Sequence, residues 1–411
     1  MKFEFVEKKE RHNARIKVVG VGGAGGNAIN NMISSGLEGV DFIAANTDSQ
    51  DLDRSASPQK IQLGPSITMG LGAGADPEIG RSSAEESIHE IKDLVHGSDM
   101  VFITAGMGGG TGTGASPIIA RECKENGALT VAVVTKPFRF EGEKRMKRAM
   151  EGIKCLRNEV DSLIIIPNER LRSLSSKSTT FKELISQADE VLLHAVRGIS
   201  DLIMSNGYIN LDFADVKRVM EQMGAAIMGL GRASGENRAT EAAQMAINSP
   251  LLEDISIDGA KGLLMNITGP PDVTMDEIEE ASNFIKEEVN EDAEIFWGVV
   301  LDDTMEDEVQ ATVIATGIDS NGNGDGSLAS NVYDNVVNIR DVTSEEAEED
   351  WTVRFNGVNL DTPTYQRKKE GVGPSASIDE GEEIREKRGI LSRFGLREDL
   401  DYPTFLRLKA D

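Results

Sequence analysis

The stretch AGMGGGTGTGASP, residues 105–117, places six glycines and two threonines in the nine positions 106–114. Glycine weakens helices and strands, so this density indicates a backbone that must approach something closely. The apolar run before it (98–106) predicts a buried strand, and the stretch after it (115–128) predicts a helix with Pro117 in its first turn. A glycine loop between a strand and a helix N-terminus is typical of a phosphate site.

Length and composition limit the class of protein. At 411 residues the chain is long enough for two domains, and a formal net charge of −27 argues against nucleic acid or anionic lipid as a partner. Its two cysteines, Cys123 and Cys155, allow neither a disulfide framework nor a zinc site, as in a reducing cytosol. The charged start of the chain and the absence of an apolar run of about 18 residues predict a cytoplasmic protein without direct membrane insertion.

The first part of the chain has the pattern of an α/β fold. Short apolar runs alternate with amphipathic stretches, which predicts a mostly parallel sheet covered by helices. The predicted strands are residues 15–20, 40–46, 99–106, 129–135 and 162–167. Such sheets bind ligands at the carboxyl ends of their strands, so we expect the glycine loop and its neighbouring loops to meet there.

A long helix and a second α/β unit follow. From residue 181 onwards, apolar residues recur every three or four positions, which predicts one helix of roughly 24 residues and about 36 Å. The second unit is expected to hold helices at 214–223, 236–247 and 274–289, and strands at 226–231, 262–268, 295–302 and 309–316.

Residues 341–388 carry 13 Asp or Glu and 7 Lys or Arg with few large apolar residues, which predicts a disordered acidic linker.

A second glycine cluster raises an alternative. Gly20, Gly22 and Gly25 satisfy the G-x-G-x-x-G pattern of dinucleotide-binding proteins, so a Rossmann-type NAD-dependent oxidoreductase is one hypothesis. That pattern also needs an acidic residue at the end of the second strand, where this chain has Asn46 and Thr47. The lysine-containing G-x-x-x-x-G-K-[ST] loop is missing from the sequence, which argues against a P-loop protein.

The loop GGGTGTG after a strand resembles the phosphate loop of the tubulin/FtsZ superfamily, and residues 13–318 follow the pattern of its bacterial cell-division branch in order. The resemblance implies a GTP-dependent, self-assembling GTPase of the division ring at mid-cell. A tubulin-like filament protein for plasmid segregation or cell shape is the alternative within the superfamily. The implied divisions are an N-terminal extension (1–12), a GTP-binding domain (13–180), a central helix (181–208), a C-terminal GTPase-activating domain with a mixed sheet (209–318), a disordered linker (319–391) and a partner-binding peptide (392–411).

The resemblance also implies a site for GTP or GDP, with Mg²⁺ on the phosphates and no metal ligand from the protein itself. Loops 20–27, 46–48, 70–80 and 106–114 correspond to the family's phosphate-side loops, and Asp76 stands in the third where Asn is expected. The stretch KPFRFEGEKR (136–145) resembles the family's ribose loop, with Glu141 and Arg145 as contacts. The implied nucleotide contacts are Gly22, Gly23, Ala24, Gly25, Gly26, Asn27, Asn46, Ala73, Gly106, Gly108, Gly109, Gly110, Thr111, Gly112, Thr113, Glu141, Arg145, Asn168, Ile185 and Asp189.

Three of these positions concern the base, and two of them, Asn168 and Asp189, resemble the family's guanine contacts. A carboxylate at Asp189 can accept two N–H donors from the edge of guanine, which adenine lacks. Ile185, four residues earlier, stands where the family often has a phenylalanine that stacks on the base, so we expect weaker stacking.

Hydrolysis needs a group that orients water, and no base is evident near the glycine loop. The stretch INLDFADV (209–216) resembles the family's synergy loop, which completes the active site of the adjacent subunit. The resemblance implies that Asp212 and Asp215 polarise the water and that Asn210 helps to position it. The residue pattern alone equally fits Asp212 as a helix N-cap and Asp215 as a first-turn acid.

The end of the chain carries a second implied interaction. Within DYPTFLRLKAD (401–411), Tyr402, Pro403, Phe405 and Leu406 resemble the family's partner-binding peptide. The resemblance implies membrane adaptor and regulator proteins of division as partners, in addition to a head-to-tail homopolymer.

Overall fold

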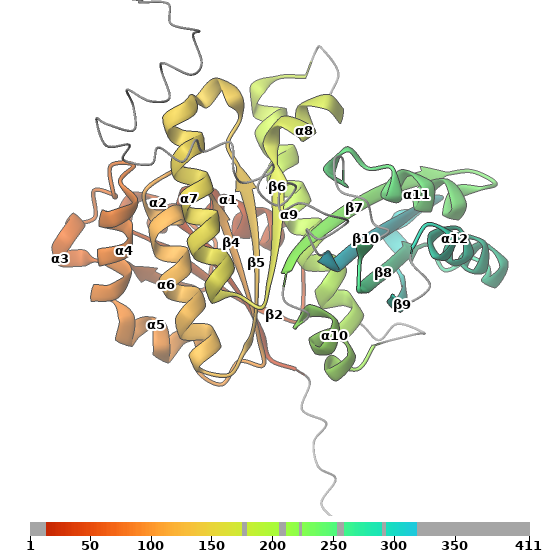
Figure 1. Ribbon diagram of the computed structural model, residues 1–411, viewed down its shortest axis with the longest axis horizontal. Coiled ribbons are helices and arrows are strands. Elements are labelled where there is room, and N and C mark those ends of the chain that lie inside the picture. Colours follow the sequence, from red (N-terminus) through yellow and green to blue (C-terminus); the bar gives the residue numbers. More distant parts are fainter. Residues whose placement is uncertain are drawn as a thin grey trace, which may run out of the picture. The chain divides into compact units, whose positions relative to one another are not determined.

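The computed structural model describes residues 14–174, 179–204, 211–221, 224–252, 259–289 and 293–318 (Figure 1). These residues form a ten-stranded sheet with the strand order β3-β2-β1-β4-β5-β6-β7-β10-β8-β9. None of the helices in these ranges is long and apolar enough to cross a lipid bilayer. The predicted N-terminal extension, linker and C-terminal peptide lie outside the described residues.

The first six strands are parallel to their neighbours, as predicted. They are β1 (Ile16–Val21), β2 (Val40–Asn46), β3 (Gln59–Gln62), β4 (Met100–Gly106), β5 (Leu129–Lys136) and β6 (Ser162–Pro167). Five of them match the predicted strands to within one residue at each end. The edge strand β3 was not predicted, because Ile61 is its one buried side chain and the strand lacks an apolar run.

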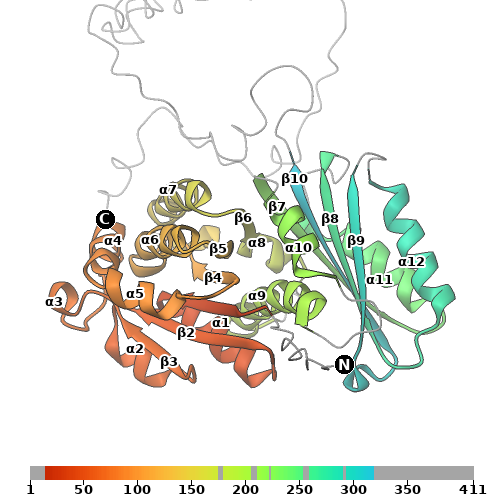
Figure 2. The same ribbon diagram turned by 90° about the horizontal axis from the view of Figure 1, so that it is seen from below.

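Helices cover both faces of this parallel part (Figure 2). They are α1 (Gly22–Ser34), α2 (Ser49–Arg54), α3 (Pro65–Thr68), α4 (Pro77–Glu86), α5 (Ile88–Val95), α6 (Thr111–Glu125), α7 (Glu143–Glu159) and α8 (Asn168–Leu174). Side chains alternate along each strand, so Val18 and Phe102 enter the core under α1, whereas Val19 and Ile103 enter the core under α4 to α7. This two-sided burial explains the near-continuous apolar runs in the sequence.

The predicted start of α6 is wrong. The helix begins at Thr111, inside the glycine loop, and Pro117 lies in its second turn. Proline has no N–H to donate to the carbonyl of Thr113, so the helix lacks one backbone hydrogen bond there. The first turn of α6 is therefore formed by TGTG itself, which brings the free N–H groups of the helix directly to the end of β4.

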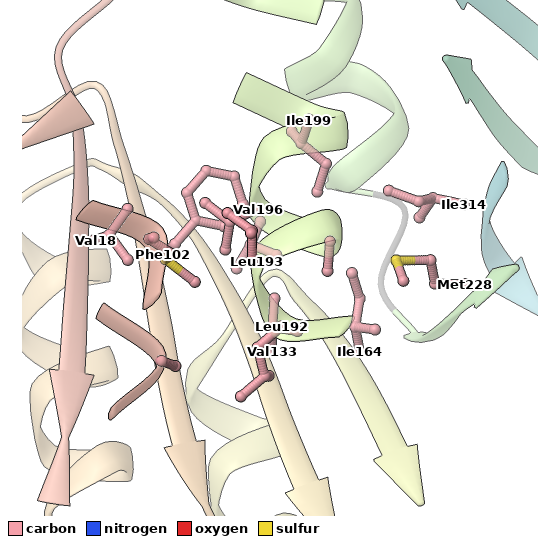
Figure 3. Packing of buried hydrophobic residues seen from close by; sticks show 14 of the residues in the cluster. Val18, Phe102, Val133, Ile164, Leu192, Leu193, Val196, Ile199, Met228 and Ile314 are labelled. Carbon is pink, nitrogen blue, oxygen red and sulfur yellow. The ribbon is translucent and has the colours of Figure 1, made fainter. Parts of the chain in front are cut away.

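The long helix is confirmed as α9, Phe181–Met204, with 24 residues. Its apolar side chains Leu192, Leu193, Val196 and Ile199 belong to one buried cluster that contains residues of both halves of the chain (Figure 3). Residues of the first half in this cluster are Val18, Phe102, Val133 and Ile164, and residues of the second half are Met228 and Ile314.

The second half has a mixed sheet, as predicted. Its strands are β7 (Gly224–Ser234), β8 (Gly262–Gly269), β9 (Glu294–Leu301) and β10 (Glu308–Ile318), with β10 antiparallel to β7 and β8. Its helices are α10 (Phe213–Met220), α11 (Arg238–Ile247) and α12 (Met275–Glu287). Three residue pairs between β6 and β7 continue the sheet from the first half into the second.

A buried guanidinium holds three loops of this half together. Arg238, with a side chain only 7% exposed, contacts Glu277 at 2.9 Å and both Asp272 and Asp307 at 3.0 Å. A buried arginine is stable only when its donors are satisfied, so this cluster sets the relative positions of the loops before α11, α12 and β10.

We predict that Phe102→Ala lowers the free energy of unfolding by about 3–5 kcal/mol, because the ring is fully buried between β4 and α9 and its loss leaves a cavity. Urea denaturation followed by circular dichroism measures this change. Met245→Ala, at a mostly exposed position of α11, is the control and should change stability by no more than about 0.5 kcal/mol. Equal effects of the two substitutions would contradict this core.

Candidate functional site

Two helix N-termini meet at the carboxyl ends of adjacent strands. Helix α1 follows β1 and helix α6 follows β4, and neither has a side-chain cap or an acidic residue in its first turn. By contrast, Asp48, Asp76 and Thr274 cap α2, α4 and α12 with their side chains. Free N–H donors and two positive dipole ends directed at one place make an anion site.

The two N-termini approach each other closely enough to require glycine. Gly22 has a φ of +72°, and a Cβ atom built on it would lie 3.0 Å from the backbone nitrogen of Gly112. Behind the loop, the backbone N–H of Gly108 donates to Thr113 Oγ1 at 2.8 Å. A Cβ on Gly109 would meet no atom within 4 Å, so the loop is open on that side.

The next loops fasten onto this cradle. The hydroxyls of Thr47 and Thr111 are 2.6 Å apart, and the N–H of Gly72 donates to the carbonyl of Thr47 at 3.2 Å. A Cβ on Gly110 would lie 2.8 Å from the Cβ of Ala73. The structure thus brings together residues 46–48, 70–80 and 106–114, as the sequence predicted.

Asp76 has a structural function where asparagine was expected. One of its carboxylate oxygens accepts the N–H of Glu78 at 3.0 Å and so caps α4. Aspartate and asparagine are equally good N-caps, so this departure preserves the shape of the loop.

The predicted ribose-side residues lie beside the cradle. Glu141 and Arg145 form an ion pair at 3.0 Å, and a Cβ on Gly108 would lie 2.8 Å from Cγ of Arg145. Glu141 also accepts the N–H of Phe138 at 2.8 Å. The N–H of Arg139 donates to Glu169 at 3.1 Å, which links this loop to the start of α8.

The predicted base-side residues have unsatisfied or desolvated oxygen atoms. Asn168 is the first residue of α8 and only 8% exposed, and its Oδ1 has no hydrogen-bond partner among the described residues. Burial raises the pKa of Asp189, on the adjacent helix α9, to about 6. Ile185 lies one turn before Asp189 and is partly buried. Both oxygen groups are suited to accept N–H donors from a ligand.

Several residues beside the site were not among the predicted nucleotide contacts. Thr47 and Asp51 lie at the phosphate side, where Asp51 faces the start of α1. At the base side, Phe140 stacks on Phe138 with ring centroids 5.1 Å apart and meets Phe181 edge-on at 6.1 Å. Phe140 and Phe181 are 62% and 64% exposed. In the sequence, the signal for them was two large apolar residues close to predicted site residues.

The predicted catalytic acids lie elsewhere. Asp212 precedes α10 and is exposed, and its side chain makes no capping hydrogen bond, so the alternative of a side-chain N-cap is not realised. Asp215 lies in the first turn of α10. The N–H of Leu211 donates to the carbonyl of Leu202, which holds these acids at the far end of α9, about 36 Å from its start (Figure 1). Asn210, Tyr402, Pro403, Phe405 and Leu406 lie outside the described residues.

Comparisons with known proteins match both halves of the chain to the same family. A model of the GTPase domain of the Tubulin/FtsZ family matches residues 15–176, and a model of the C-terminal domain of the FtsZ family matches residues 224–319. The Cell division protein FtsZ of Coxiella burnetii is 49% identical over 96% of each chain. Its namesake from Pseudomonas aeruginosa is 47% identical over the full length of both chains.

Solved structures with the same fold are also found. An empty FtsZ dimer from M. jannaschii is 47% identical with a TM-score of 0.73, covering 76% of this chain and 90% of that chain. CetZ2 from Haloferax volcanii, solved as a GTPγS-bound protofilament, is 21% identical with a TM-score of 0.64, covering 74% of this chain and 94% of that chain. The second likeness concerns the fold alone.

The raised pKa of Asp189 predicts a pH-dependent stability. Because the folded pKa of about 6 exceeds the ordinary aspartate pKa of 3.8, the folded state favours the protonated carboxyl, and the ionised form destabilises the fold as pH rises through this window. Asp189→Asn should therefore raise the thermal midpoint of the ligand-free protein at pH 8, and the gain should disappear near pH 4.

The adjacent residue provides a control of opposite sign. The hydrogen bond with His194 lowers the pKa of Glu190, so Glu190→Gln should lower the thermal midpoint at neutral pH. Thermal melts of the two variants at pH 4 and pH 8 measure both effects. A loss of stability in Asp189→Asn at pH 8 would contradict the raised pKa of Asp189.

Proposed function

This chain belongs to the tubulin/FtsZ family as a cell-division GTPase of the FtsZ type, and on that premise we propose that it hydrolyses GTP in an active site shared between consecutive subunits of a filament. The observation that carries the proposal is the distance between the two halves of the site. The glycine cradle lies at the carboxyl ends of β1 and β4, whereas Asp212 and Asp215 follow the end of α9, where Met204 lies against Gly39 just before the start of β2, so one subunit does not bring them together.

In the proposed complex the cradle holds the phosphates. The N–H groups at the starts of α1 and α6 donate to phosphate oxygens, and the dipoles of both helices favour the negative charge. These groups are fixed before the ligand arrives by the contacts of Gly22 with Gly112 and of Thr47 with Thr111. Fixed donors need no reorganisation as charge develops during phosphoryl transfer.

The ribose and the base occupy the other side of the proposed site. Arg145, already paired with Glu141, donates to ribose oxygens, and the Glu141 carboxylate accepts a ribose hydroxyl. Asp189 accepts the two N–H groups of the guanine edge, and the unpartnered Oδ1 of Asn168 accepts a further donor. Adenine presents the wrong pattern to Asp189, which provides the discrimination.

Hydrolysis is completed by the neighbouring subunit. The exposed, uncapped carboxylate of Asp212 accepts a proton of the attacking water and orients its oxygen in line with the γ-phosphate. Asp215, one turn into α10, adds negative charge that favours this orientation. Asn210 is proposed to position the same water.

Mg²⁺ is expected to sit on the phosphates and to neutralise their charge. In the described part of the chain, no three His, Cys, Asp or Glu side chains are grouped so that they hold a metal ion. The oxygens of Asn46 and Asp51 beside the start of α1 are hard donors of the kind Mg²⁺ prefers, so the residues present fit an ion held mainly by phosphate and water.

This arrangement makes assembly a condition of activity. A nucleotide end and an acidic end on opposite sides of one subunit give a heterologous, head-to-tail contact, which propagates into an open filament. The FtsZ dimer from M. jannaschii among the similar solved structures supports the association of subunits.

We predict that two inactive variants restore each other's activity. Asp212→Asn/Asp215→Asn keeps the cradle but loses the water-orienting carboxylates. Gly112→Ala keeps the acids but disturbs the cradle, because its Cβ would lie 2.6 Å from the carbonyl oxygen of Gly106. Each variant alone should hydrolyse GTP at least about 100-fold more slowly than the wild type, and an equimolar mixture should recover a substantial fraction of the wild-type rate.

Phosphate release against protein concentration provides the companion measurement. The specific activity of the wild type should rise with concentration, since the site forms only between subunits. A mixture that shows only the sum of the two residual activities, or a specific activity independent of concentration, would contradict the shared site.

We also propose that residues 396–411 bind a division partner that connects filaments to the membrane. The segment holds Tyr402, Pro403, Phe405 and Leu406, together with Arg407 and Lys409 in an otherwise acidic chain. A short apolar and basic segment suits a partner groove that accepts a helix or an extended peptide.

Deletion of residues 396–411 should leave GTP turnover and the thermal midpoint unchanged and should abolish mid-cell localisation of a fluorescent fusion. Arg407→Ala/Lys409→Ala in the full chain tests the charge separately and should weaken localisation. Loss of GTPase activity or thermal stability on deletion would instead assign the segment to the folded body.

A further inference from the structure

A carboxylate lies beside the start of α1, one of the two helix N-termini that form the anion site. The Oδ2 atom of Asp51, on α2, lies 3.4 Å from the position that a Cβ on Gly23 would occupy. No other atom outside the start of α1 lies within 4 Å of that Cβ position. Asp51 also lines a cavity of about 280 Å³ together with Gly22, Gly23, Asn27 and its ion-pair partner Arg54. A negative charge thus faces the first turn of a helix whose N–H groups have no side-chain cap.

Asp51 is held in this position by its own helix. Its N–H donates to the capping carboxylate of Asp48 at 3.4 Å, and Oδ2 accepts the side-chain N–H of Asn46 at 3.5 Å. Its cationic partner is Arg54, at 4.0 Å. The side chain of Asp51 is 46% exposed and that of Arg54 is 77% exposed. An exposed pair at that distance neutralises little of the charge, so the carboxylate remains an effective anion beside the site.

From this geometry we propose that Asp51 makes nucleotide binding depend on a divalent cation. The inference rests on the proposed function, in which the phosphates dock at the starts of α1 and α6. A phosphate group in that place is repelled by the Asp51 carboxylate unless a cation lies between or beside them. Mg²⁺ removes the repulsion because the oxygens of Asp51 and Asn46 are donors that it accepts, directly or through water.

The expected size follows from the charges. Two unit charges about 6 Å apart at an effective dielectric constant of about 40 change a dissociation constant roughly tenfold. Asp51 therefore lowers the affinity of the cradle for a nucleotide that carries no metal ion.

The test uses the full chain, stripped of nucleotide, and GDP as the probe in calorimetric titrations with Mg²⁺ or with EDTA. Asp51→Asn keeps the shape of the side chain and its capacity to accept from Asn46, but removes the charge. In EDTA it should bind GDP roughly tenfold more tightly than the wild type. In Mg²⁺ the two proteins should agree within about twofold.

Two further variants separate this effect from general charge. Asp53→Asn, an exposed position on the same helix, should behave like the wild type in both buffers. Asp51→Ala repeats the charge removal if Asp51→Asn does not fold, and should give the same gain in EDTA. Unchanged or weaker GDP binding by both Asp51 variants in EDTA would overturn the inference, as would an equal gain in Asp53→Asn. If the wild type binds no GDP in either buffer, the proposed function itself fails.

Discussion

The direct pairing of β1 with β4 is the constraint on which the site depends. The two strands are parallel and in register to their ends, where Val21 lies opposite Ala105. Strand β1 passes directly into α1, and only the four residues 107–110 separate β4 from α6, so the two helices start beside each other at the same edge of the sheet. Side chains at Gly22 or Gly112 would force the two helices apart, and the anion site would be lost with them. The glycines of both clusters are thus needed for one close approach.

Much of this arrangement could be predicted from the sequence because buried parallel strands leave clear apolar runs. The strands β2 and β6 match the predicted residues, and α9 is evident from its periodicity. The edge strand β3 escaped prediction because a half-exposed edge needs few apolar residues. The start of α6 was misplaced because Pro117 is a familiar first-turn residue. The helix begins earlier, at Thr111, and the TGTG residues form its first turn.

Tertiary features of the site were less accessible. That Asp51 faces Gly23 depends on how α2 packs against α1, and a single aspartate in a short polar stretch carries no signal of this. The short pairing of β6 with β7 likewise depends on the placement of two distant segments. The resemblance to a family supplied the proposed roles of Asp189 and Asp212, which residue types alone left open, and the structure adds that Asp189 is desolvated and that the side chain of Asp212 caps no helix.

The shared cluster around α9 has a consequence for synthesis on the ribosome. All six parallel strands are present once residue 167 has been made, but the face that contains Phe102, Val133 and Ile164 packs against α9 and, beyond it, against Met228 and Ile314. A nascent chain that has not yet reached those residues exposes apolar surface that the finished protein buries. The N-terminal half is therefore expected to need protection from aggregation until almost the whole folded body has emerged.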